Sequence, residues 1–153
     1  MNTKRYVHSA VLVGNEIYII GGLDDGLNEL DKVEIFDPIT NTFRDGPVLP
    51  IPIYGAAAMT VNQYIIVNGG RTTGENENVN FNSYTLDTTT PNDEWIERAQ
   101  QNIDNRKYHA GAVLNQDKLV VCGGKDSNHK TLDTIEYISF QDLSGIGKMV
   151  CYQ

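Results

Sequence analysis

The side chains best able to do chemistry in this chain are its histidines and cysteines, but their spacing is not that of a catalytic or metal site. His8 and His109 occupy equivalent places in two similar segments that each begin with an arginine. A residue that recurs at equivalent places usually serves packing or a shared hydrogen bond, so we expect no metal at either one. Cys122 and Cys151 lack the short spacing of a zinc or redox motif, and Cys122, which ends an apolar run, is expected to be a buried free thiol.

A second candidate is the acidic stretch that begins at Asp24. Asp24 and Asp25 precede Gly26, and further carboxylate and amide side chains follow up to residue 31. Oxygen ligands of this kind suit Ca²⁺, yet the stretch lacks the alternating ligand spacing of an EF-hand loop. An Asp-Gly pair is equally typical of a tight turn. We therefore expect no metal here and keep Asp24 and Asp25 as candidate contacts for a partner.

No motif for covalent or phosphoryl chemistry stands out. The chain has no nucleophile elbow, and neither a Ser-His-Asp set nor a Cys-His pair is recognisable in its spacing. Its glycine pairs do not open helices, so they are not phosphate-binding loops. The sequence therefore favours binding over catalysis and predicts no cofactor.

A glycine doublet occurs three times, and each copy closes an apolar run. The doublets are Gly21-Gly22, Gly69-Gly70 and Gly123-Gly124. They recur about every 50 residues with similar segments on both sides, and a period of this length is typical of the blades of a β-propeller. In such a blade, glycine permits positive φ and lets neighbouring blades approach closely.

Four strand-like segments follow one another in each repeat. This predicts an all-β fold of three four-stranded antiparallel blades, near residues 5–46, 52–100 and 105–151. Small residues dominate the first segment of each repeat, as suits strands crowded around an axis. No window shows a clean helical period, so no helix is expected, and residues 1–153 are expected to form a single repeat domain.

These repeats resemble those of the kelch family. In that family an arginine-containing opening precedes the doublet, a strand ending in Tyr-Asp follows it, and a tryptophan comes several residues later. Phe36, before Asp37, and Phe43 take the aromatic places in the first repeat, and Trp95 takes the tryptophan place in the second. The third repeat keeps the doublet but has no tryptophan. Aromatic side chains at these places are expected to pack between blades.

The resemblance implies a kelch-type β-propeller that binds a partner protein or peptide through its inter-strand loops and is not an enzyme. Some kelch-like propellers are enzymes, so a galactose-oxidase-like activity, with copper held by tyrosine and histidine, stays open as an alternative. No such ligand set can be mapped onto this chain. A fragment of a longer kelch protein without activity of its own is the other alternative.

Charge and hydropathy narrow the choice of partner. The chain has 12 Lys and Arg against 20 Asp and Glu, and its cations are scattered. Nucleic acids and anionic membranes require clustered cations, so neither is expected as a partner. No apolar run approaches the roughly 20 residues of a membrane span, no signal peptide follows Met1, and no Asn-x-Ser/Thr sequon occurs. We therefore expect a cytoplasmic location.

Three repeats leave the predicted propeller open, because propellers generally have about four to eight blades. The two end blades would then expose apolar faces. Two copies of the chain could pair head-to-tail as a homodimer with six blades, or further blades could complete the ring. The abrupt start of the first strand favours further blades.

The loops that follow the doublets differ most between the repeats, whereas the strands stay alike. In a four-stranded meander these loops and the connections between blades emerge on one face, and variable loops on a constant scaffold are how a fold acquires specificity. Arg71, Lys125 and Lys130 place cations there in a chain of net charge −8. With His129 in the same loop as the two lysines, they predict binding of an acidic peptide.

Overall fold

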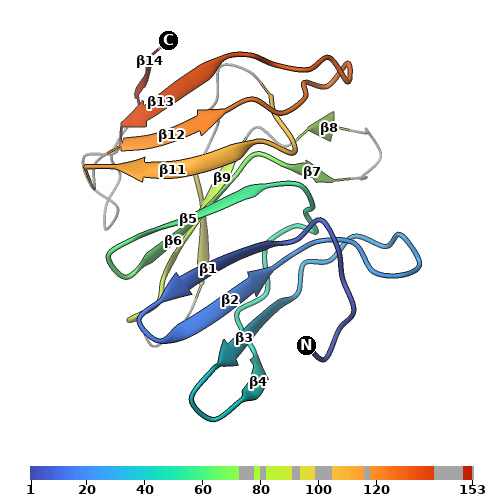
Figure 1. The fold of residues 1–153 in the computed structure, drawn as a ribbon, viewed down its shortest axis with the longest axis vertical. Coiled ribbons are helices and arrows are strands. Elements are labelled where there is room, and N and C mark those ends of the chain that lie inside the picture. Colours follow the sequence, from blue (N-terminus) through green and yellow to red (C-terminus); the bar gives the residue numbers. More distant parts are fainter. Residues whose placement is uncertain are drawn as a thin grey trace.

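The fold is all-β, as the sequence predicts, and most of its described strands belong to three four-stranded sheets (Figure 1). This computed structural model describes residues 1–72, 78–79, 82–90, 94–98, 105–115, 118–139 and 150–152. Each of the three sheets is antiparallel and four-stranded, which confirms the predicted blades. Within these ranges there is no helix long and apolar enough to cross a membrane.

Each blade is built from consecutive strands. Blade 1 contains β1 (Ser9–Val13), β2 (Glu16–Ile20), β3 (Val33–Asp37) and β4 (Thr42–Asp45). Blade 2 contains β5 (Ala57–Val61), β6 (Tyr64–Asn68), β9 (Ser83–Asp87) and β10 (Trp95–Arg98). Blade 3 contains β11 (Ala110–Leu114), β12 (Lys118–Cys122), β13 (Ile135–Ser139) and β14 (Val150–Tyr152). A two-stranded ribbon of β7 (Arg71–Thr72) and β8 (Asn78–Val79) follows β6, where the sequence predicts only a loop.

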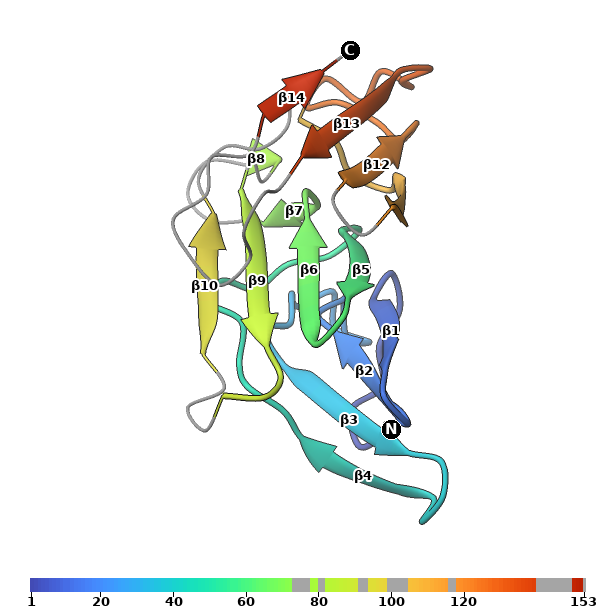
Figure 2. The same ribbon diagram turned by 90° about the vertical axis from the view of Figure 1, so that its left-hand side faces the viewer.

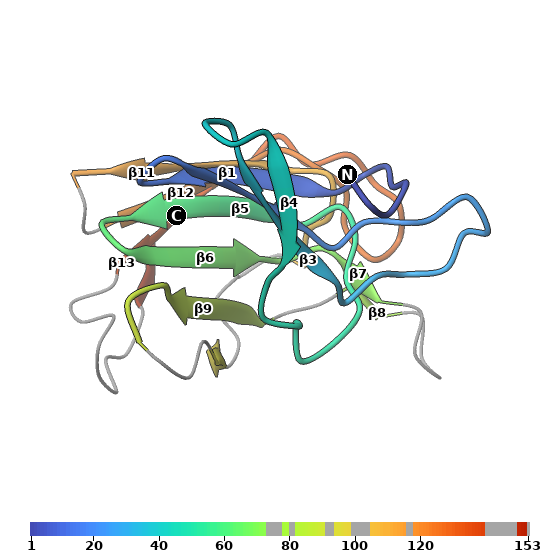
Figure 3. The ribbon, with the colours of Figure 1, turned by 90° about the horizontal axis from the view of Figure 1, so that it is seen from below.

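The first strand of each blade lies at its inner edge. β1, β5 and β11 lie side by side in Figure 3, and Figure 2 shows β4 and β10 at the outer edges of their blades. Small side chains allow this close approach. A Cβ atom on Gly111 of β11 would lie only 2.6 Å from Sδ of Met59 on β5. The sequence predicts small residues in the crowded inner strands, and direct contact between neighbouring inner strands explains why they occur there.

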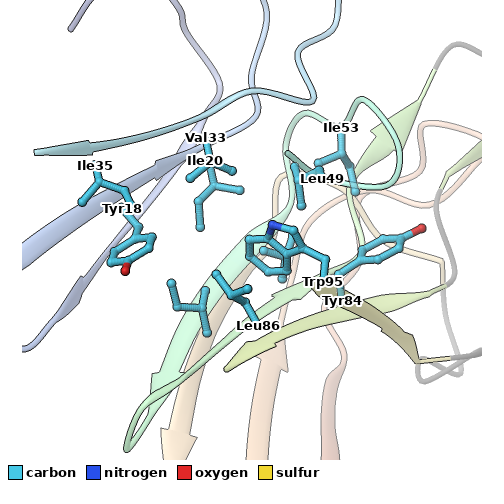
Figure 4. Packing of buried hydrophobic residues seen from close by; sticks show 11 residues of the cluster. Tyr18, Ile20, Val33, Ile35, Leu49, Ile53, Tyr84, Leu86 and Trp95 are labelled. Carbon is cyan, nitrogen blue, oxygen red and sulfur yellow. The ribbon is translucent and has the colours of Figure 1, made fainter. Parts of the chain in front are cut away.

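Two apolar cores lie between neighbouring blades. The core between blades 1 and 2, shown in Figure 4, contains Tyr18, Ile20, Val33, Ile35, Leu49, Ile53, Ile65, Val67, Tyr84, Leu86 and Trp95. The core between blades 2 and 3 contains Ala57, Met59, Val61, Ile66, Leu119 and Val121. Successive side chains of a strand point to opposite faces of its sheet, so blade 2 contributes to both cores.

The glycine doublet joins each blade to the next. The Gly22 N–H group donates to the Ile53 carbonyl at 2.9 Å, and the Gly70 N–H group donates to the Arg106 carbonyl at 3.0 Å. Gly21 has a φ of 63°, and a Cβ atom on it would lie 2.3 Å from the Ile53 carbonyl oxygen. Positive φ and the close approach of the next blade both require glycine here.

Blades 1 and 3 each contain a buried ion pair that joins the doublet to the third strand. Arg5 donates to a Glu34 carboxylate oxygen at 2.8 Å and to the Gly21 carbonyl at 2.9 Å. Arg106 pairs with Glu136 in the same way in blade 3. All four charged side chains are almost completely excluded from solvent, so each charge depends on its partner.

Blade 2 has apolar side chains in place of this ion pair. Ile53 takes the place of Arg5, and Tyr84, the second residue of its strand, takes the place of Glu34. Both are buried in the core between blades 1 and 2. A buried ion pair and a well-packed apolar pair are often close in stability, and this chain uses both at one position of its repeat.

Candidate binding face

The loops that follow the doublets lie together at one end of the blades, at the right of Figure 1. Antiparallel pairing brings the end of each second strand to the same end of the blade as the connection that leads to the next blade. Hydrogen bonds join the two: Ile53 N–H donates to the Leu30 carbonyl at 3.1 Å, and Leu49 N–H donates to the Asp31 carbonyl at 2.9 Å. We call this surface the doublet-side face; it comprises residues 21–32, 46–56, 69–72, 105–108 and 123–134.

Two loops of this face adopt the same turn, each built around an aspartate. Asp24 Oδ1 accepts hydrogen bonds from the N–H groups of Gly26 and Asn28, both at 2.8 Å. Asp126 Oδ1 accepts equivalent bonds at 2.9 Å from the N–H groups of Asn128 and Lys130. The side-chain amide of Asn28 contributes most to lowering the pKa of Asp24. Asp24 therefore stabilises a tight turn, which the sequence offered as the alternative to a Ca²⁺ ligand.

Of the remaining acidic side chains of this face, Asp25, Glu29 and Asp31 lie on the blade 1 side, and Asp133 lies exposed in blade 3. Asp25 forms an exposed ion pair with Lys4 at 3.4 Å. Glu29 accepts a hydrogen bond of 3.4 Å from the Thr72 hydroxyl and so links the blade 1 loop to β7. Among the described residues, no three or more His, Cys, Asp or Glu side chains are grouped so as to hold a metal ion.

The predicted cations come to the same face but differ in exposure. Arg71 and Lys125 each follow a doublet directly and form backbone bridges with Tyr54 and Lys107 at the start of their blades. Arg71 is half-buried, whereas Lys125 and Lys130 are exposed. Lys125 and Lys130 are thus the most accessible of the three predicted cations.

Two residues of this face were not predicted from the sequence: Lys107 and Tyr108. Lys107 is almost completely buried; its Nζ atom lies 3.4 Å from Nδ1 of His129 and 6.0 Å from the centre of the Tyr108 ring. Tyr108 is half-exposed and packs against Tyr54, with ring centres 6.2 Å apart. Aligning Lys107 with Tyr6 and Tyr54, which hold the same repeat position, would have drawn attention to this buried cation.

Of the two equivalent histidines, His109 lies in the interface between blades 2 and 3, whereas His8 is half-buried beside Gly22 of its own blade. Nε2 of His109 lies 3.3 Å from Oδ1 of Asn68 in blade 2, and Nδ1 is buried without a hydrogen-bond partner. Burial, and then the nearby Arg106, lower the pKa of His109 to about 4. Burial and Arg5 likewise lower the pKa of His8. His109 therefore joins blade 3 to blade 2 as a neutral side chain.

The predicted interblade aromatics have unequal surroundings. Trp95 is buried between blades 1 and 2, and its Nε1–H group donates to the Pro47 carbonyl at 2.9 Å. Phe36 and Phe43 stack on one another with ring centres 4.6 Å apart, but both are only half-buried. Cys122 is also half-buried, contrary to the buried thiol expected from the sequence, because it lies on the face of blade 3 that turns away from blade 2.

Three four-stranded blades joined through glycine doublets define the class of this protein as a kelch-type β-propeller. The chain matches the KLHDC2/KLHL20/DRC7 Kelch-repeats domain model over residues 1–143, and it belongs to the kelch-repeat family. The sequence-based recognition of kelch repeats is thereby confirmed.

Named relatives show the same repeats in larger proteins. Beta-scruin of Limulus polyphemus is 30% identical over 128 residues, which cover 81% of this chain and 14% of beta-scruin. Kelch-like protein 6 of Homo sapiens is 32% identical over 75 residues, which cover 49% of this chain and 12% of that protein. The solved structure of YjhT superimposes with a TM-score of 0.77 at 17% identity and shares the fold, covering 99% of this chain and 46% of its own. The chain thus spans less than half of each of these proteins.

Proposed function

We propose that this chain is a non-catalytic protein-interaction module whose doublet-side face binds an acidic peptide segment of a partner protein. The observation that carries the proposal is the exposure of Lys125 and Lys130 on the loop after the blade 3 doublet, in a chain of net charge −8. The kelch-repeat family and fold support a protein-interaction scaffold in general.

The surroundings of these lysines suit a peptide carboxylate. Lys107 lies buried beneath these loops, with its Nζ atom 3.4 Å from Nδ1 of His129. The half-exposed ring of Tyr108 offers an apolar surface beside it. Asp25 and Glu29 would repel an acidic segment from the blade 1 side of this face.

The same charge distribution bears on the other partners. Since acidic side chains outnumber cations by 20 to 12, we propose that neither nucleic acid nor an anionic membrane is bound. The sequence has no Asn-x-Ser/Thr sequon, and we propose that the protein acts in the cytoplasm.

A peptide selection followed by affinity measurements tests this function. Peptides selected from a random library on the wild-type protein should be enriched in Asp and Glu. Fluorescence anisotropy should then show that the Lys125→Ala/Lys130→Ala variant binds them about tenfold more weakly, a loss of about 1.4 kcal/mol. Arg71→Ala is measured separately because Arg71 is half-buried.

A matched variant controls for the loss of net charge. Arg44→Ala/Lys118→Ala removes two positive charges as well, but Arg44 lies on an outer strand and Lys118 at the opposite end of β12 from the doublet. This variant should bind like the wild type. Selected peptides without acidic residues, or equal affinities of both double variants with intact circular dichroism, would contradict the proposal.

A further inference from the structure

The two junctions inside this chain use the same pair of backbone hydrogen bonds. At each, the second glycine of the doublet donates to the opening segment of the next blade, as Gly70 does to Arg106. Two residues after that acceptor, an N–H group donates back to the previous blade: Gly55 to the Val7 carbonyl at 3.0 Å, and Tyr108 to the Gly55 carbonyl at 2.7 Å. A blade junction therefore needs one donor and one acceptor from each side.

At the open sides of blades 1 and 3, the equivalent backbone groups have no neighbouring blade to bind. In blade 3, the Gly124 N–H group and the Tyr108 carbonyl form no hydrogen bond with any described residue. In blade 1, the Arg5 carbonyl and the Val7 N–H group are likewise unbonded within the described part of the chain. The groups offered by blade 3 are the complement of those offered by blade 1.

Side chains on the open face of blade 3 are apolar and uncovered. In blade 1, Val33 and Ile35 of the third strand are 0% and 4% exposed because blade 2 covers them. The equivalent residues of blade 3, Ile135 and Tyr137, are 49% and 37% exposed. Burying these two side chains would be favourable. Because they are exposed on blade 3, this face is suited to contact with another blade.

The open face of blade 1 carries the matching apolar side chains. In blade 2, Leu86 and Trp95 form the surface that covers blade 1, and both are buried. Phe36 and Phe43 occupy the same two places in blade 1 and are only half-buried. Their stacked rings are therefore positioned to cover the open face of another blade.

We propose that blade 1 of a second copy of this chain docks on the open face of blade 3, and that two such contacts close a six-bladed ring with twofold symmetry. Both ends of each copy are then used, as closed symmetry requires. The size of the ring agrees with the fold comparison, since one copy covers 46% of the YjhT chain. Formation of the ring does not depend on the proposed binding of an acidic peptide.

Molar mass in solution tests the ring directly. Size-exclusion chromatography with light scattering should give twice the chain mass of 17.0 kDa for the wild type. Ile135→Lys/Tyr137→Lys places two charges on the open face of blade 3 and should give a monomer at the same concentration. The control Ile39→Lys/Val48→Lys changes two side chains that are 78% and 61% exposed elsewhere, and it should remain a dimer.

Amide hydrogen exchange gives a second readout that needs no variant. The Gly124 and Val7 amides should be protected in the dimer and lose protection on dilution, whereas the Gly70 and Tyr108 amides of the internal junctions should stay protected. A wild-type mass of one chain, a mass above two chains, or exchange at Gly124 that does not depend on concentration would overturn the proposal.

Discussion

Acid should destabilise this protein through His109, and the structure gives the size of the effect. Burial is the main cause that lowers the pKa of His109 from 6.5 to about 4, and Arg106 adds to it. Protonation would also place a second donor at Nδ1, which is buried without a partner. The unfolded chain therefore binds this proton more tightly than the folded protein does.

The sign and range of the effect follow from the two pKa values. The contribution of His109 to stability is complete above pH 6.5, falls as the unfolded chain takes up the proton, and levels off near pH 4. The full difference corresponds to about 3 kcal/mol, of which about 2 kcal/mol should be lost between pH 7.5 and pH 5.

Urea unfolding at the two pH values measures this loss. Trp95, the single tryptophan, reports on the core between blades 1 and 2 through its fluorescence. His109→Gln cannot titrate, and its unfolding free energy should change less with pH than that of the wild type by about 2 kcal/mol. His129→Gln, which replaces an exposed histidine, is the matched substitution measured beside it. Equal pH dependence of the wild type and His109→Gln would refute the reasoning.

Three further predictions concern stability and metal content. Glu34→Ala should cost about 3–5 kcal/mol in urea unfolding because it leaves a buried arginine charge without its partner, whereas Arg44→Ala, which breaks an exposed pair, should cost less than about 1 kcal/mol. Gly21→Ala should cost about 3 kcal/mol because its Cβ atom would meet the Ile53 carbonyl, while Gly14→Ala, with similar φ but open space, should cost about 1 kcal/mol. Equal losses within either pair would contradict these assignments. Elemental analysis of the purified protein should find less than stoichiometric copper and iron, and a full equivalent of either metal would favour the enzymatic alternative.

The blades could be predicted from the sequence because their determinants are local. An apolar run, a glycine doublet and a turn are each readable within a few residues, and their recurrence identifies the fold. The β7–β8 ribbon was missed because two strands of two residues each carry no readable alternation. The half-buried state of Phe36 could not be predicted either, since it depends on which blade lies beside it.

The charged interior was harder to predict than the surface. Lys107 and Glu136 look like surface residues by type, yet both are almost fully buried. A signal was nevertheless present, because Arg5 precedes Glu34 by 29 residues and Arg106 precedes Glu136 by 30. Opposite charges that recur at equivalent positions of two repeats indicate a structural ion pair, just as the recurrence of His8 and His109 indicates a structural role.

The central claim, that the doublet-side face is the recognition surface, is tested most directly by amide hydrogen exchange with a selected acidic peptide bound. The account predicts added protection at the Lys125 and Lys130 amides and none at Asn15, Asn62 and Asn115, which lie in the turns at the other end of the blades. Protection confined to those three turns, with the Lys125 and Lys130 amides unchanged, would contradict it.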